Sequence, residues 1–193
     1  MNEISLYKKS TAKKLFLVGF MATGKTTIGK KLSSKLNLPF FDSDKEIELA
    51  LGCSINEYFR TNEESKFRAI EEKIIIEKIK NNKDNNFIMS LGGGAYLNYN
   101  IRELINCVGI SIWLNGNIDI IYNRLKKSKI KRPLMVTFNT KEKLEKLLKE
   151  RILYYQKADI KVNIINTSKD NMSDIILNQI EEYVSIKDGK NKN

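Results

Sequence analysis

Residues 15–27 read LFLVGFMATGKTT, and this stretch decides the fold class. The apolar run Leu15–Val18 predicts a buried strand. The residues from Gly19 to Thr26 match the phosphate-binding pattern G-x-x-x-x-G-K-[ST], and an amphipathic helix is predicted directly after them. Because the pattern stands in the strand–loop–helix setting that it requires, a chance glycine turn is a poor explanation for it.

Each part of this loop has a chemical purpose. Its glycines let backbone N–H groups converge on phosphate oxygens, and the N-terminus of the following helix adds positive potential. Lys25 is expected to reach the β- and γ-phosphates of ATP, and the Thr26 hydroxyl is expected to be a ligand of Mg²⁺. We therefore expect ATP to lie against Gly19, Met21, Ala22, Thr23, Gly24, Lys25, Thr26 and Thr27.

The rest of the chain alternates short apolar runs with stretches of helical spacing. This alternation predicts an α/β fold, a three-layer α/β/α domain with a five-stranded parallel sheet. Strands are expected at 15–19, 39–41, 87–91, 109–114 and 160–165, and helices at 25–36, 44–51, 55–59, 63–80, 99–107, 118–126, 141–156 and 173–184.

One domain is expected over residues 15–185, which suits a chain of 193 residues. Residues 1–14 are expected to form a flexible basic arm and residues 186–193 a polar tail. The polar, basic stretch 127–139 surrounds Pro133 and lies between two predicted helices. A mobile lid is therefore expected there.

The composition excludes whole classes of chemistry. The sequence has no histidine, so Ser-His-Asp catalysis, Cys-His catalysis and His-containing zinc sites are ruled out. Two cysteines are too few for a four-thiolate metal site or a disulfide framework, which favours a reducing, cytoplasmic location. Of these two, Cys107 is expected to be buried.

The chain is strongly basic, with 34 Lys and Arg against 23 Asp and Glu and a net charge of +11. The excess consists mostly of scattered lysines, without a dense arginine block or interleaved aromatic residues. This distribution favours small anionic ligands, and a nucleic-acid surface remains the alternative. No apolar stretch reaches the roughly 18 residues of a membrane helix. We therefore expect no nucleic-acid partner and no membrane association.

Two carboxylates follow the second predicted strand. Asp42 and Asp44 are two residues apart, and in an extended chain such positions face the same way. Both are thus expected to point into one cleft at the carboxyl edge of the sheet. There one could support Mg²⁺ while the other accepts a proton from, or orients, an attacking hydroxyl. The alternative is that Asp44 only caps the next helix.

Glycines and arginines supply the remaining candidates. Gly92, Gly93 and Gly94 follow the strand expected at 87–91, and three consecutive glycines suggest close approach of the backbone to a ligand, with a plain flexible turn as the alternative. Arginine pairs with carboxylate or phosphate in a bidentate way that lysine cannot, although any single arginine could be a solvated surface charge. The candidate arginines are Arg68, Arg132 and Arg151.

Taken together, these elements resemble the shikimate kinase family over roughly residues 15–183. The resemblance implies a fold of the phosphate-loop (P-loop) kinase type and ATP-dependent phosphorylation of the 3-hydroxyl of shikimate. Separately, we expect the protein to act as a monomer. One position departs from the family pattern, since Ala22 stands where the family usually has another glycine. If that position requires a positive φ, the side chain costs on the order of 1 kcal/mol. The elements that carry the resemblance are residues 19–26, 41–44, 67–71, 90–95 and 132–135, and Arg151 with Tyr154 close behind.

The resemblance also implies roles for the candidates. Asp44 would act on the substrate hydroxyls as base or orienter, and Arg68 and Arg151 would bind the shikimate carboxylate. Gly93, with Gly92 and Gly94 on either side, would lie beside the substrate ring. Lys25 and the lid residue Arg132, also an ATP contact, would stabilise charge on the transferring phosphoryl group. Thr26 would bind Mg²⁺ directly, and Asp42 would support it through water.

Two alternatives remain open. One is a kinase of the same architecture for another small acceptor, such as gluconate or a nucleoside monophosphate. The glycine triplet with Arg68 and Arg151 argues against it, because these residues make a carboxylate pocket and not a second nucleotide site. The other alternative is a non-catalytic binding protein that keeps the fold. The joint presence of Lys25, Thr26, Asp44 and Arg132 argues against that, because loss of catalysis would relax those identities.

Overall fold

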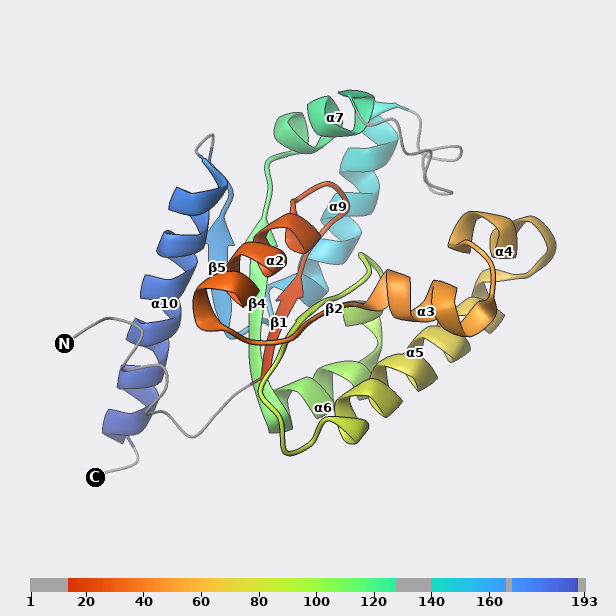
Figure 1. Cartoon of the computed structure of the whole chain (residues 1–193). Helices are drawn as coiled ribbons and strands as arrows, with labels where there is room; N and C mark the ends of the chain where they lie inside the picture. The colour runs from red at the N-terminus through yellow and green to blue at the C-terminus, as the bar shows by residue number, and fades with distance from the viewer. Residues whose placement is uncertain (1–13, 128–139, 166–167, 191–193) are drawn as a thin grey trace.

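Five short strands form one parallel sheet in the order β2-β3-β1-β4-β5 (Figure 1). The structure is a computed structural model and describes residues 14–127, 140–165 and 168–190. The predicted α/β class, with a five-stranded parallel sheet, is confirmed. The strands are β1 (Lys14–Val18), β2 (Phe40–Asp42), β3 (Ile88–Ser90), β4 (Gly109–Asn115) and β5 (Ile160–Asn163).

Helices cover both faces of the sheet, which gives the three layers that the sequence predicts (Figure 1). The described elements are α2 (Lys25–Leu36), α3 (Ser43–Leu51), α4 (Ile55–Thr61), α5 (Glu64–Asn81), the 3-10 turn η1 (Ala95–Leu97), α6 (Tyr99–Val108), α7 (Ile118–Lys127), α9 (Lys141–Tyr155) and α10 (Lys169–Lys190).

Strand β1 is buried on both sides and divides the interior into two cores. Leu15 and Leu17 pack with α2 and α10, while Phe16 and Val18 face the core formed with α5, α6, α7 and α9. This explains why the strand reads as a continuous apolar run and not as an alternating one. Because β1 lies between β3 and β4, the loop after it opens at the point where the strand order reverses, where ligands of such sheets bind.

Local capping explains several helix ends that the sequence predicts. Ser54 and Glu57 form a capping box at the start of α4, and Gly52 ends α3 in the left-handed conformation with φ 68°. The Thr140 side chain accepts a hydrogen bond from the Lys143 N–H at the start of α9. These interactions satisfy backbone groups that a helix end leaves unpaired.

Two expectations about the second half of the chain are wrong. Cys107 is exposed, because α6 turns its apolar stripe of Ile101 and Ile105 toward the core and Cys107 lies off that stripe. Helix α10 is longer than predicted and extends to Lys190, beyond the expected end at Val184. Lys187 in this extension lies over the Tyr183 ring and forms an ion pair with Asp159, which ties the added turn to the domain.

Most of the expected lid, residues 128–139 with Arg132, lies outside the described residues, and so do residues 1–13. The lid, the arm and the role of Arg132 therefore stay predictions. Among the helices that the structure describes, none combines the length and the apolar composition needed to cross a bilayer.

Candidate active site

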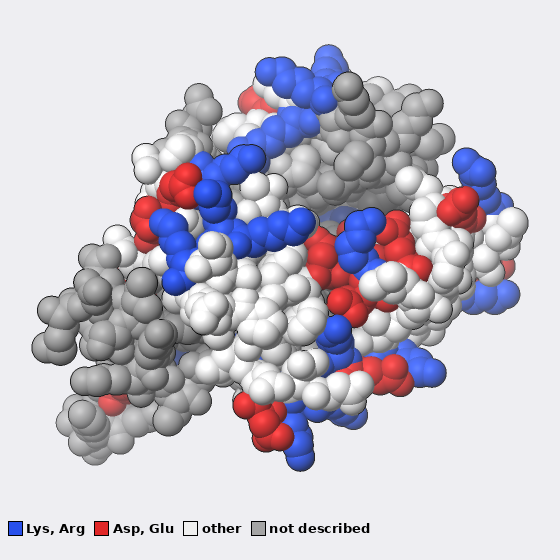
Figure 2. All heavy atoms as spheres, in the orientation of Figure 1, with Lys and Arg blue, Asp and Glu red and all other residues white. Residues whose placement is uncertain are grey.

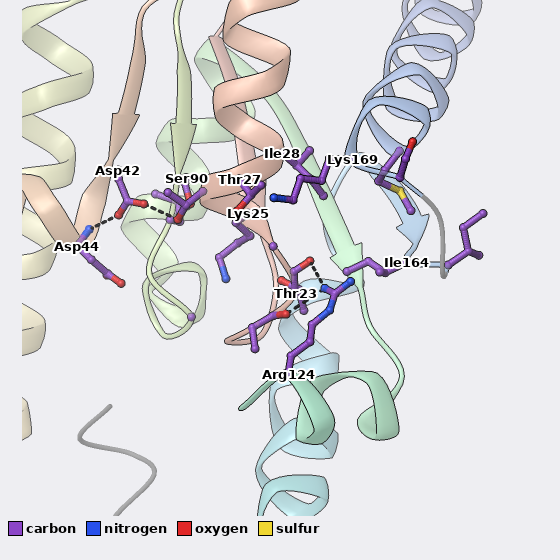
Figure 3. Close-up of a pocket in the computed structure, with 18 residues that line it drawn as sticks. Thr23, Lys25, Thr27, Ile28, Asp42, Asp44, Ser90, Arg124, Ile164 and Lys169 are labelled. Carbon is purple, nitrogen blue, oxygen red and sulfur yellow. Dashed lines mark hydrogen bonds between the residues drawn. The ribbon is translucent and has the colours of Figure 1, made fainter. Parts of the chain in front are cut away.

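A cavity of about 410 Å³ opens at the carboxyl ends of the strands (Figure 3). It brings together candidates from distant parts of the sequence: the phosphate loop from Ala22 to Thr27, both carboxylates, and Gly93. Arg68, Gly92, Gly94 and Arg151 lie around the adjoining glycine-rich turn, as described below. Asp42 and Asp44, which were expected to share one cleft at this edge of the sheet, both line the cavity.

Side chains of the phosphate loop hold its shape by donating hydrogen bonds to its backbone carbonyl groups. The ammonium group of Lys25 is buried and donates hydrogen bonds to the carbonyl oxygens of Gly19 (2.8 Å) and Phe20 (2.9 Å). The Thr23 hydroxyl donates to the Phe20 carbonyl at 2.8 Å. Gly19 has φ 136°, and a Cβ there would lie 2.7 Å from the Leu114 carbonyl oxygen, so only glycine fits. The loop is thus preformed around the end of β1.

Ala22 adopts φ 59°, which is the positive value that glycine accepts most easily. The Ala22→Gly variant is expected to raise the free energy of unfolding by about 0.5 kcal/mol, because relief of left-handed strain outweighs the greater freedom of glycine in the unfolded chain. Urea unfolding measures this change. The control is Ala50→Gly on the exposed side of α3, where glycine should instead destabilise by about 1 kcal/mol. A loss of stability in both variants would contradict the assignment of strain.

The two carboxylates lie at the junction of β2 and α3. The expectation of an extended chain through Asp44 is wrong, because α3 already begins at Ser43. Asp42, and not Asp44, is the N-cap: its Oδ1 accepts from the Asp44 N–H at 3.1 Å. The other oxygen of Asp42, Oδ2, accepts from the Thr26 hydroxyl at 2.6 Å. Both carboxylates nevertheless line the cavity beside the phosphate loop (Figure 3).

The glycine-rich turn after β3 is packed against charged side chains. A Cβ on Gly92 would lie 2.5 Å from Oδ1 of Asp44 and 3.1 Å from Oε1 of Glu71, and one on Gly94 would lie 2.5 Å from Nη1 of Arg68. The Gly92 N–H also donates to the Ser43 hydroxyl at 2.8 Å. The glycines of this turn are thus closely packed against side chains of the chain itself, and close approach to a ligand stays a prediction. A plain flexible turn does not explain these contacts.

The Gly92→Ala variant should lower kcat/KM for the acceptor substrate about a hundredfold, because the new methyl group must displace the Asp44 carboxylate. Misplacement of a catalytic group by about 1 Å commonly has an effect of this size. Steady-state kinetics measures it. The matched control is Gly52→Ala, which has left-handed φ but no atom within 4 Å of the added Cβ. That variant should lose about 1 kcal/mol of stability with unchanged kinetics, and equal kinetic losses in both would contradict the prediction.

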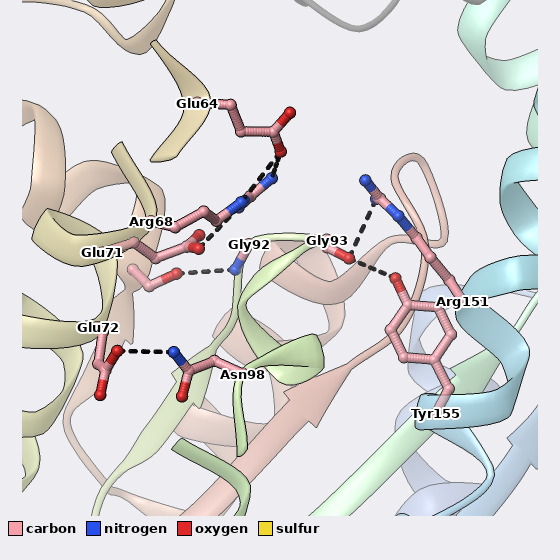
Figure 4. Close-up of polar contacts among 10 residues, drawn as sticks. Glu64, Arg68, Glu71, Glu72, Gly92, Gly93, Asn98, Arg151 and Tyr155 are labelled. Atoms are coloured by element: carbon pink, nitrogen blue, oxygen red, sulfur yellow. Dashed lines mark hydrogen bonds and ion pairs between the residues drawn. The ribbon is translucent and has the colours of Figure 1, made fainter. Parts of the chain in front are cut away.

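Two arginines flank the glycine-rich turn (Figure 4). Arg68 forms ion pairs of 2.7 Å with Glu64 and with Glu71. Burial alone would lower the pKa of Arg68, but these carboxylates outweigh it and the pKa is raised. Burial raises the pKa of Glu71, an effect that Arg68 opposes and the neighbouring Asp44 carboxylate strengthens. Glu71 is thus a buried acid in the site that the sequence did not single out as functional.

Arg151 approaches from α9 on the other side. It is 4% exposed, its Nη1 donates to the Gly93 carbonyl at 3.1 Å, and its guanidinium carbon lies 5.4 Å from the centre of the Phe20 ring. Its Nε is buried without a hydrogen-bond partner among the described residues. A buried guanidinium with an unsatisfied donor is suited to a carboxylate ligand.

Several cavity residues were not predicted from the sequence. Arg124 of α7 donates to the carbonyl oxygens of Ala22 (3.1 Å) and Thr23 (3.2 Å), so it braces the phosphate loop from outside. The other unpredicted residues that line the cavity are Ile28, Ser90, Leu91, Ile164, Ile165, Ser168, Lys169 and Met172.

Figure 2 shows acidic side chains gathered over α3, with basic side chains on both sides of them. The first turn of α3 contributes Asp44 and Glu46 to this region. This local negative patch contrasts with the net charge of +11 of the whole chain. It lies beside the phosphate loop. The two charge types meet in the cavity, as a site for a nucleotide phosphate and a reacting hydroxyl requires.

The fold and the site define a P-loop kinase, in which a phosphate loop faces a carboxylate across a cleft of a parallel sheet. A sequence model of shikimate kinase matches residues 21–183. Shikimate kinase from Bartonella quintana is 39% identical over 170 residues, which are 88% of this chain and 79% of that protein. Its counterpart from Mesorhizobium japonicum is 34% identical over 175 residues, 91% of this chain and 84% of that protein.

The solved structure of shikimate kinase from Acinetobacter baumannii in complex with shikimate has a similar fold. The two structures match with a TM-score of 0.82 and 30% sequence identity. The match covers 91% of this chain and 96% of the chain from Acinetobacter baumannii. The chain belongs to the shikimate kinase family. The resemblance inferred from the sequence motifs is thereby confirmed.

Proposed function

We propose that this protein transfers the γ-phosphoryl group of ATP to the 3-hydroxyl of shikimate, which gives shikimate 3-phosphate and ADP. The observation that carries the proposal is the arrangement of one cavity: the phosphate loop on one side, Asp44 at the centre, and the glycine-rich turn with two arginines beyond it. Family membership adds the substrate class.

The phosphate loop is the proposed site for ATP. Backbone N–H groups between Gly19 and Thr27 would bind its phosphates, and Lys25 would exchange its two carbonyl partners for phosphate oxygens. Arg124 would keep the loop in place through its contacts with Ala22 and Thr23. Arg132, from the segment outside the described residues, is proposed to add a second positive charge at the transferring group.

Thr26 and Asp42 are the residues proposed to hold Mg²⁺. A hydroxyl and a carboxylate that already lie 2.6 Å apart are hard oxygen donors, which this cation prefers, and a kinase site leaves its other positions to phosphates and water. Among the described residues, no group of three or more acidic or thiol side chains is placed to hold a metal ion. When bound, the cation would neutralise charge between the β- and γ-phosphates.

Asp44 and the two arginines are the proposed acceptor site. The Arg151 and Arg68 guanidinium groups lie on opposite sides of the glycine-rich turn and would bind the shikimate carboxylate. The ring would then lie against Gly92, Gly93 and Gly94, which leave space because they have no side chains. Asp44 would accept the proton of the attacking 3-hydroxyl or orient that hydroxyl toward the phosphoryl group.

Small molecules are the only partners that the proposal requires. The charges that line the described part of the cavity suit a nucleotide and a small carboxylate more than a nucleic acid. That the protein acts as a monomer stays a prediction. A cytoplasmic location stays a prediction from the cysteine content.

The test is ADP release with ATP and Mg²⁺ in the presence of shikimate, gluconate or AMP. Turnover with shikimate alone, lost when Mg²⁺ is chelated, is the expected result. Turnover with gluconate or AMP in place of shikimate would refute the assigned acceptor. Nucleotide binding without turnover on any acceptor would instead support the non-catalytic alternative.

A further inference from the structure

Tyr155, the last residue of α9, lies one helical turn after Arg151, and both side chains converge on the Gly93 carbonyl (Figure 4). The Tyr155 hydroxyl donates to this oxygen at 2.5 Å and Arg151 Nη1 donates at 3.1 Å. A carbonyl oxygen has two lone pairs, so these two donors saturate it. The motif that carried the family resemblance pointed to Tyr154, yet its neighbour makes this contact.

Gly93 is the point where the two halves of the site touch. A Cβ on Gly93 would lie 3.4 Å from Nη1 of Arg151, 3.5 Å from the Met21 nitrogen and 3.8 Å from the Gly19 carbonyl oxygen. The turn that would hold the acceptor is therefore in contact with the phosphate loop. A rotation of the Gly93 peptide would change both the spacing between these loops and the direction of the arginine.

Tyr155 is well placed to prevent that rotation. It is fully buried, and its ring centre lies 6.1 Å from that of Trp113 on β4. Burial raises the pKa of the Tyr155 hydroxyl to about 12, although Arg151 opposes the shift. The hydroxyl thus remains protonated and able to donate at neutral pH. A phenylalanine would fill the same space without this donor.

We propose that Tyr155 is a positioning residue whose hydroxyl fixes the Gly93 carbonyl, so that the glycine-rich turn and the Arg151 guanidinium keep the geometry that binds the acceptor. Without the hydroxyl, Arg151 would be the remaining donor to this carbonyl, and its guanidinium would be drawn away from a substrate carboxylate. The identity of that acceptor as shikimate rests on the proposed function.

The experiment compares Tyr155→Phe with Tyr154→Phe, its neighbour on α9, whose ring contacts the Arg102 guanidinium. In Tyr155→Phe we expect KM for shikimate to rise about tenfold and kcat to fall severalfold. Changes of this size are typical when one buried hydrogen bond to a functional group is lost. KM for ATP should change less than twofold. Tyr154→Phe should match the wild type in all three quantities.

Hydrogen exchange followed by mass spectrometry gives a readout that does not depend on turnover. The backbone amides of residues 92–95 should exchange faster in Tyr155→Phe than in the wild type, while those in the β1 and β4 strands keep their protection. Tyr154→Phe should leave exchange unchanged throughout. A purely structural role for Tyr155 predicts instead a uniform increase across the core.

The two proposals can fail separately. If the wild type phosphorylates shikimate and Tyr155→Phe keeps the wild-type KM, kcat and exchange, the positioning role is overturned. An equal rise in both KM values would overturn it as well. If the wild type does not act on shikimate, the proposed function fails, and the positioning role of Tyr155 is then judged from the hydrogen exchange of residues 92–95 alone. Faster exchange of these residues in Tyr155→Phe but not in Tyr154→Phe would support the positioning role. Unchanged exchange would refute it.

Discussion

Replacing Lys25 by methionine is expected to lower kcat about a thousandfold while the protein stays folded. The ammonium group of Lys25 is buried in the phosphate loop, and its removal would take away the cation proposed to stabilise charge on the transferring phosphoryl group. Loss of one preorganised electrostatic partner typically has effects of 10²–10³ on kcat. Methionine keeps the unbranched stem of the side chain and most of its length, and it removes the hydrogen bonds to the Gly19 and Phe20 carbonyl oxygens together with the charge.

The measurement is ADP release at saturating substrates, with circular dichroism to verify folding. Lys30→Met serves as the control, because Lys30 is on the exposed side of the same helix α2 and should give wild-type rates. Turnover above about a tenth of the wild-type rate in Lys25→Met would show that the cation is not essential for transfer and that the assigned ATP site is wrong.

The Asp44→Asn variant is expected to lose a factor of about 10³ in kcat, within the range that removal of a general base produces. Asparagine retains the size of the side chain and its ability to orient a hydroxyl, but it cannot accept a proton at neutral pH. Stability should not fall, because the Asp44 charge raises the pKa of the buried Glu71 and its removal relieves repulsion between the two carboxylates.

Affinity for ATP distinguishes this effect from general damage to the site. Trp113 is the one tryptophan in the sequence, and its Cδ1 would lie 3.4 Å from a Cβ on Gly19, so its fluorescence should report nucleotide binding. Asp44→Asn should bind ATP as the wild type does. Asp84→Asn, on the exposed loop before β3, is the control for charge alone. If Asp44→Asn turned over at the control's rate, the proposed role of Asp44 would be untenable.

The sequence predicts best what is contiguous along the chain. The phosphate loop is a strand, a turn and a helix in succession, so a local pattern was enough to place Lys25 and Thr26. The carboxylate pair was assigned to the right edge of the sheet but with the wrong local geometry, because the start of α3 at Ser43 depends on capping by Asp42. Propensity and spacing do not determine which of two nearby aspartates caps a helix.

Contacts between distant segments could not be predicted in the same way. The glycine triplet suggested close packing, but the partners come from α3 and α5, and nothing local points to Asp44, Arg68 or Glu71 as those partners. The two hydrogen bonds from Arg124 to the phosphate loop join residues that are 101 and 102 positions apart in the sequence. Tyr155 is fully buried, and no pattern in the sequence indicates its hydrogen bond to the Gly93 carbonyl, which depends on the folded arrangement of α9 and the glycine-rich turn.

The position of β1 between β3 and β4 also determines when the site can form during synthesis. β1 lies at the beginning of the domain, yet its two neighbours are Ile88–Ser90 and Gly109–Asn115. A ribosome that adds roughly 5–20 residues per second needs on the order of ten seconds to supply both partners. Until then the apolar run Leu15–Val18 has no sheet to enter, so a nascent chain depends on chaperones or on early contacts with α2 to shield it.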